Sequence, residues 1–117
     1  MDLNEAIRAH SDWKIKLRAA INQRSRLDIA GIARDNLCPL GQWLHGESRQ
    51  SHGALDAHKD CLKMHAKFHL EAAKVATLIN TGNYPAAEAA LQAGTGFTKA
   101  SSEVTAAIMA LMRKATA

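Results

Sequence analysis

Histidine and cysteine are the residues of this sequence whose type and spacing could do chemistry. The chain of 117 residues contains six histidines and two cysteines. Imidazole nitrogen and thiolate sulfur are ligands that zinc prefers, usually four of them in a tetrahedron. Two of the histidines, His65 and His69, stand four residues apart. On a helix this spacing places both imidazoles on one face, one turn apart, where they can share a metal ion.

The histidine pair is a weak signal by itself, because this spacing also arises by chance in a chain with six histidines. The position of the pair in the sequence strengthens this signal. Both residues fall on the apolar stripe of the longest periodic segment, and His10 falls in the stripe of another. A buried imidazole needs hydrogen-bond partners or a metal. Two interpretations therefore stay open, a shared metal ion or core histidines bonded to carbonyls and carboxylates.

The two cysteines differ in their reach toward such a metal. Cys61 is predicted on the same helix as the pair, about 9 Å along the axis from an ion shared by the pair. A zinc–sulfur bond of about 2.3 Å cannot span that distance, so Cys61 is predicted to be an ordinary small residue of the core or of the helix side. Cys38 lies on a separate segment and is free to approach. Pro39 suits a first helical turn, which predicts Cys38 at a helix cap, where its thiolate is favoured.

The other histidines are not predicted to bind metal. His58 lies further from the pair than Cys61 does, and the segment 46–53 is read as a polar loop. The two histidines in and beside this loop are predicted to be solvated: His45 and His52.

Helices must position these residues. The chain is rich in alanine and leucine, has two prolines and shows no cluster of strand formers, which favours helix over sheet. Apolar residues at helical spacing predict a first helix that begins at Asp2 and breaks within 22–25. They also predict a short piece that starts at Leu27 and ends near residues 35–36, another after Cys38, a long helix over 55–79 stopped by Gly82, and helices over 86–93 and 97–114. The fold class predicted is all-α, an antiparallel four-helix bundle with an additional short helix carrying the cysteine, in one domain of residues 1–117.

Charge and hydropathy exclude several classes of protein. The formal net charge is +4, and the basic residues are scattered, unlike the dense stripe of a nucleic-acid-binding protein. We find no secretory signal and no apolar run of about 18 residues that could span a membrane. The expected compartment is the reducing cytoplasm, where a thiol stays available for metal or redox chemistry.

Three elements in order resemble the chemoreceptor zinc-binding domain family. They are His10-x-x-Trp13, Cys38-x-Leu40-Gly41-x-Trp43 and His65-x-x-x-His69, separated by 24 and 21 residues. The resemblance covers nearly the whole chain. It implies one Zn²⁺ ion held by three histidines and a cysteine: His10, Cys38, His65 and His69.

The resemblance also implies a role. Members of the family are four-helix bundles, often homodimeric, in bacterial chemoreceptors and diguanylate cyclases, where they sense zinc or oxidants such as hypochlorous acid. It therefore implies a cytoplasmic, bacterial, homodimeric regulator with Cys38 as the redox-sensing residue. This chain carries neither a methyl-accepting coiled coil nor a cyclase domain. It is either an excised domain or a stand-alone member whose output partner is a separate protein.

Four further motif residues are predicted around the site. Trp13 is one turn from His10 and is predicted to shield the site, although core packing explains it equally well. Leu40 and Trp43 would dock the short helix onto the bundle, and Gly41 would allow a close approach between helices.

Four functions remain to be weighed. Four protein ligands close the coordination sphere, which favours a regulatory or structural site over a catalytic one. A zinc hydrolase would need a nearby carboxylate, but Glu71 faces elsewhere and no His-Glu-x-x-His motif is present. A di-iron site lacks its paired Glu-x-x-His motifs. We therefore predict a regulatory zinc sensor that is not an enzyme, and the alternative is a structural zinc site in an interaction module.

Overall fold

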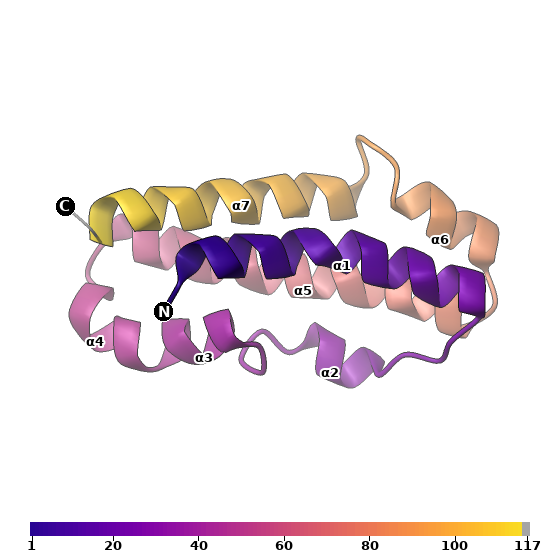
Figure 1. Cartoon of the computed structure of the whole chain (residues 1–117), viewed down its shortest axis with the longest axis horizontal. Coiled ribbons are helices and arrows are strands. Elements are labelled where there is room, and N and C mark those ends of the chain that lie inside the picture. The colour runs from indigo at the N-terminus through magenta and orange to yellow at the C-terminus, as the bar shows by residue number, and fades with distance from the viewer. Residues whose placement is uncertain (116–117) are drawn as a thin grey trace.

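A computed structural model describes residues 1–115, which form helices and no strand. Three long helices lie side by side along the molecule: α1 (Leu3–Gln23), α5 (Asp56–Asn80) and α7 (Gly96–Ala115). Helices α1 and α5 run in the same direction and α7 runs against them (Figure 1). The all-α prediction is confirmed. None of the helices in the described part of the chain combines the length and apolarity needed to cross a membrane.

Short helices make up the rest of the described chain. Along one side, α2 (Ile29–Ala33), α3 (Pro39–His45) and α4 (Glu47–His52) return from the end of α1 to the start of α5. Helix α6 (Tyr84–Ala90) leads from α5 into α7. The chain thus crosses the length of the molecule four times, but the second crossing is broken into three pieces. The predicted four main helices are not reproduced, and residues 1–115 form three long helices and four short ones.

One local prediction is wrong, because the segment 46–53 is not a loop. It forms α4, a helix of six residues. Glu47 lies in its first turn and Arg49 in its last turn, where each charge complements the helix dipole. Ser48 is its one buried residue. The apolar stripe that reveals a helix in sequence is therefore missing.

The ends of the long helices follow ordinary capping chemistry. The Asp2 carboxylate accepts hydrogen bonds from the amides of Asn4 at 3.0 Å and Glu5 at 3.3 Å, which satisfies two of the free amides at the start of α1. Helix α1 ends at Gln23, and the cap residue Arg24 adopts a left-handed conformation with φ of 52°. After α5, Gly82 takes a φ of 79°. These boundaries agree with the predicted ones.

The core lies mainly between α5 and α7, the pair of helices with the most extensive contact. Small residues on both helices let them approach closely, among them Ala72 and Ala76 on α5 and Ala100 on α7. The buried stripe of α5 also contains polar side chains: His58, His65 and His69. Because buried imidazoles need partners, what these three contact decides the chemistry of the molecule.

Candidate metal centre

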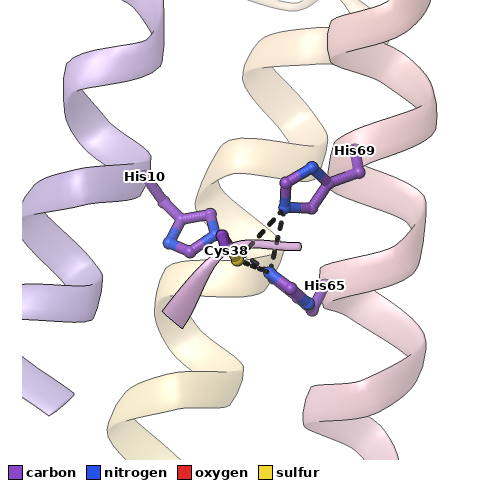
Figure 2. Close-up of side chains that lie close together, drawn as sticks. All are labelled: His10, Cys38, His65 and His69. Carbon is purple, nitrogen blue, oxygen red and sulfur yellow. Dashed lines mark hydrogen bonds between the residues drawn. The ribbon is translucent and has the colours of Figure 1, made fainter. Parts of the chain in front are cut away.

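Four side chains from three segments meet in the interior. His10 comes from α1, Cys38 from the residue before α3, and His65 and His69 from α5 (Figure 2). One ligand atom from each lies within 4.8 Å of the others. The three histidines are at most 3% exposed, and Cys38 is partly buried. The structure thus brings together all four residues predicted as metal ligands.

The spacing of the four atoms suits a small metal ion. His65 Nε2 lies 3.0 Å from His10 Nε2, 3.0 Å from His69 Nε2 and 3.2 Å from Cys38 Sγ. His69 Nε2 lies 3.7 Å from the same sulfur. Around a tetrahedral zinc ion, nitrogen ligands would be about 3.3 Å apart and a nitrogen and a sulfur about 3.6 Å apart. The cluster therefore matches a tetrahedral site within a few tenths of an ångström at these contacts.

Backbone carbonyls orient two of the imidazoles. His10 Nδ1 lies 2.7 Å from the carbonyl oxygen of Ala6, and His69 Nδ1 lies 2.9 Å from that of Ile32. A carbonyl can only accept, so Nδ1 carries the proton in each ring and the Nε2 lone pair points into the cluster. The Nε2 atoms of His10 and His69 then carry no proton, so hydrogen bonds cannot account for all the short contacts among the four ligand atoms. A metal ion bound between them can.

His65 is held differently. Its Nδ1 is buried and has no hydrogen-bond partner among residues 1–115. Its ring instead packs edge to face against the rings of His10, 4.9 Å away, and His69, 4.5 Å away. The central imidazole of the cluster is therefore positioned by packing, whereas its two neighbours are positioned by hydrogen bonds.

Burial keeps the histidines in the form that binds metal. It lowers the pKa of His65 to about 2, and the nearby His69 and His10 act in the same direction. Burial likewise lowers the pKa of His10 and of His69. Neutral imidazole has the free lone pair that a metal requires. Burial raises the pKa of the Cys38 thiol, against the effect of the Gly41 amide, and a bound cation would favour the thiolate instead.

Cys38 occupies the cap position predicted for it. Its backbone is extended, Pro39 begins α3, and the Gly41 amide donates a hydrogen bond to Sγ at 3.4 Å. Gly41 allows a close approach, but its neighbour is the turn before Cys38 and not another helix. A Cβ atom at Gly41 would lie 1.7 Å from the carbonyl oxygen of Asp35.

The other motif residues surround the cluster unevenly. The ring of Trp13 lies 6.4 Å from that of His69. Trp13 and Cys38 both line two surface hollows, of about 270 and 340 Å³. Leu40 is buried in the core, and Trp43 packs against His52 of α4 at 6.3 Å between ring centroids. Trp13 is the motif aromatic that lies beside the cluster, and its shielding role is a proposal.

The remaining cysteine and histidines lie outside the cluster. Cys61 is fully buried in the core, and burial raises its pKa to about 12. His58 bonds to Ser48, and His45 contacts a carboxylate oxygen of Asp35 at 3.1 Å. His45 is exposed as predicted, but His52 is only partly exposed because it packs on Trp43. The carbonyls of Ala6 and Ile32 were not predicted, because a backbone group leaves no signal in residue type.

Fold and cluster together define a small helical domain with a buried site of three histidines and one cysteine. The family model of the chemoreceptor zinc-binding domain matches residues 10–76, more than half of the chain, and spans all four residues. The protein therefore belongs to the chemoreceptor zinc-binding domain family. Neither the curated proteins nor the solved structures gave a match to the chain.

Proposed function

We propose that the protein is a regulatory zinc-binding domain of bacterial signalling, with His10, Cys38, His65 and His69 as the ligands of one zinc ion. One observation carries the proposal. The carbonyls of Ala6 and Ile32 orient the imidazoles of His10 and His69 so that the Nε2 atom of each lies 3.0 Å from His65 Nε2, which itself lies 3.2 Å from Cys38 Sγ. Nitrogen and sulfur donors held in this way are oriented for a metal ion. A core without a metal gains nothing from this orientation.

The donor set favours zinc. Imidazole nitrogen and thiolate sulfur are ligands that zinc binds, and four of them make a closed, four-coordinate set. The cluster found among residues 1–115 contains no carboxylate, the ligand type that magnesium, calcium and manganese prefer. Four protein ligands also leave no open position for a substrate, which supports a regulatory role over an enzymatic one.

Cys38 supports sensing. It is the least buried of the four residues, it lies on a short connection between two short helices, and it lines both surface hollows beside Trp13. A small oxidant could therefore reach its sulfur. Hypochlorous acid would convert the thiolate to sulfenic acid and release chloride, which removes a strong zinc ligand. The signal would pass to a chemotaxis or cyclic-di-GMP output domain, attached or separate, through a homodimer.

A structural zinc site in an interaction module is the second candidate, because the three histidines are almost wholly buried and closed ligand sets are typical of structural zinc. Oxidant titration separates the two. A sensor releases zinc, measured with a chromogenic chelator, as Cys38 is oxidised. A structural site keeps its zinc under the same oxidant dose.

The first experiment is elemental analysis of zinc per chain in the wild type, Cys38→Ala and Cys61→Ala. We expect about one zinc in the wild type and in Cys61→Ala, and a loss of zinc or at least a tenfold weaker affinity in Cys38→Ala. Cys61 is a matched control because it is buried but lies outside the cluster. No zinc in the wild type, or a dependence on Cys61, would show that the site assignment is wrong.

A further inference from the structure

A second polar contact joins the short helices to α5, away from the metal centre. His58 is 1% exposed and its Nε2 lies 2.9 Å from Ser48 Oγ. The Ser48 hydroxyl donates to the carbonyl oxygen of Trp43 at 2.8 Å. Since that bond uses the one hydroxyl proton, His58 Nε2 must be the donor to Ser48. The proposed zinc site does not use any of these three residues.

Ser48 is the main attachment of α4. Within α4, which lies wholly in the described part of the chain, Ser48 alone is buried. The helix has six residues, no side-chain cap at its start, and extensive contact only with α3. A helix this short is marginal without tertiary contacts. The Ser48–His58 bond therefore ties α4 to a long helix that is itself fixed in the core.

The bond also spans from α4 back to α3. Because Ser48 bonds to the carbonyl of Trp43, it holds the end of α3 and the start of α4 together across Gly46. The ring contact between Trp43 and His52 adds to this connection. Residues 39–52 thus form one unit, which we call the α3–α4 arm.

Two histidines of α5 contact the two ends of this arm, and between them Leu40 and Leu44 of α3 are buried in the core. His58 and His65 are seven residues apart on α5, two turns or about 10.5 Å along the axis, and therefore share a face. His65 contacts Cys38 Sγ at 3.2 Å, directly before the arm begins. His58 contacts Ser48, near its far end.

We infer that the Ser48–His58 hydrogen bond is a fixed anchor about which the α3–α4 arm pivots when Cys38 leaves the zinc site. The inference rests on the proposed function, since it takes zinc loss or oxidation of Cys38 as the event that frees the first end. The anchor keeps the second end in place. The movement is then a hinge opening at residues 37–41 and not a release of the whole arm.

Hydrogen exchange measured by mass spectrometry tests the anchor, on zinc-loaded and zinc-free wild type, Ser48→Ala and His58→Gln. In the wild type, we expect zinc removal to speed amide exchange over 37–41 and to leave 47–52 unchanged. In Ser48→Ala with zinc bound, exchange over 47–52 should rise about tenfold while zinc per chain stays the same, because a buried donor on His58 loses its partner. His58→Gln keeps a side-chain amide donor and should retain part of the protection.

Ser51→Ala is the matched control, since Ser51 is an exposed residue of the same helix whose hydroxyl bonds only within α4. It should behave like the wild type. Equal deprotection of 37–41 and 47–52 in the zinc-free wild type would overturn the pivot. Unchanged exchange of 47–52 in zinc-loaded Ser48→Ala would overturn the anchor while leaving the zinc site intact. A wild type that binds no zinc would overturn the proposed function itself.

Discussion

At the scale of single residues, Gly41 ties the geometry of the metal centre to the backbone. Its amide donates to Cys38 Sγ, and its Cα faces the Asp35 carbonyl with no room for a methyl group. We predict that Gly41→Ala pushes the 35–36 turn and Cys38 apart. The unfolding free energy should fall by about 1–3 kcal/mol, as for other overpacked sites. Zinc affinity should fall as well, measured by competition with a chromogenic chelator.

Gly82→Ala is the control for this substitution. Gly82 has a φ of 79°, and a Cβ atom added there would have no other atom within 4 Å. Alanine at this position therefore adds backbone strain of roughly 1 kcal/mol without touching the site. Its zinc affinity should equal that of the wild type. An unchanged affinity in Gly41→Ala would show that the contact with Asp35 does not position the sulfur.

The sequence predicts the residues of the cluster better than their orientation. The spacing of His65 and His69 follows from helical geometry, and Pro39 places Cys38 at a cap. From spacing alone the metal stays one of two interpretations, and the full set of four came from the family motif. The carbonyls of Ala6 and Ile32 fix the imidazoles, but any residue type carries a carbonyl. Only the fold shows which one lies beside a ring.

At the scale of elements, the short helices α2, α3 and α4 show where the spacing of apolar residues no longer predicts a helix reliably. Helices α1, α5 and α7 each bury a stripe long enough to read from the sequence. Helices α2 and α4 bury one residue each, Ile32 and Ser48. Helix α2 packs apolar side chains on the core and was predicted from them, whereas α4 is held to α5 by a polar contact of Ser48, so no repeat of apolar residues marks α4.

Asn80, the last residue of α5, makes a second polar contact of this kind, with the segment before α2. Its side chain accepts from the Leu27 amide and donates to the Leu27 carbonyl, both at 2.8 Å, and so ties the connection between α1 and α2 to the end of α5. We predict that Asn80→Ala lowers the unfolding free energy by about 1–3 kcal/mol in urea denaturation, because two partly buried backbone groups lose their partner. Zinc per chain should not change. Gln92→Ala, which removes an exposed bond to Glu88, should have little effect on stability.

At the scale of the whole molecule, a metal ion would join three segments that otherwise share few contacts near the site. Binding to the folded state alone stabilises it by about 2.7 kcal/mol when free zinc is 100 times the dissociation constant. For a domain of this size that amounts to roughly 10 °C in Tm. We predict that a chelator lowers Tm by about this much in the wild type and in Cys61→Ala. A Tm in Cys38→Ala as sensitive to the chelator as that of the wild type would contradict the ligand set.

The zinc-free protein should also lose stability in mild acid. Burial lowers the pKa of His10, His65 and His69 in the folded chain, whereas an unfolded histidine titrates near about 6.5. Below that pH these histidines bind protons in the unfolded chain but stay neutral in the folded chain. Stability is therefore complete above pH of about 6.5 and falls as the pH drops toward the folded pKa values.

Each of these histidines approaches a slope of about 1.4 kcal/mol per pH unit well below pH 6.5, and integration over the range gives a loss of up to about 3 kcal/mol for the three together between pH 6.5 and 5.5. Urea denaturation of the zinc-free chain across this range measures the loss. The variant His65→Gln should show a shallower slope, because it removes the imidazole with the lowest pKa. A flat profile in the wild type would mean that the metal-free cluster opens to solvent and that its histidines titrate freely. In that case the converging lone pairs would exist only with the metal bound, and zinc would organise the site instead of entering a preformed one.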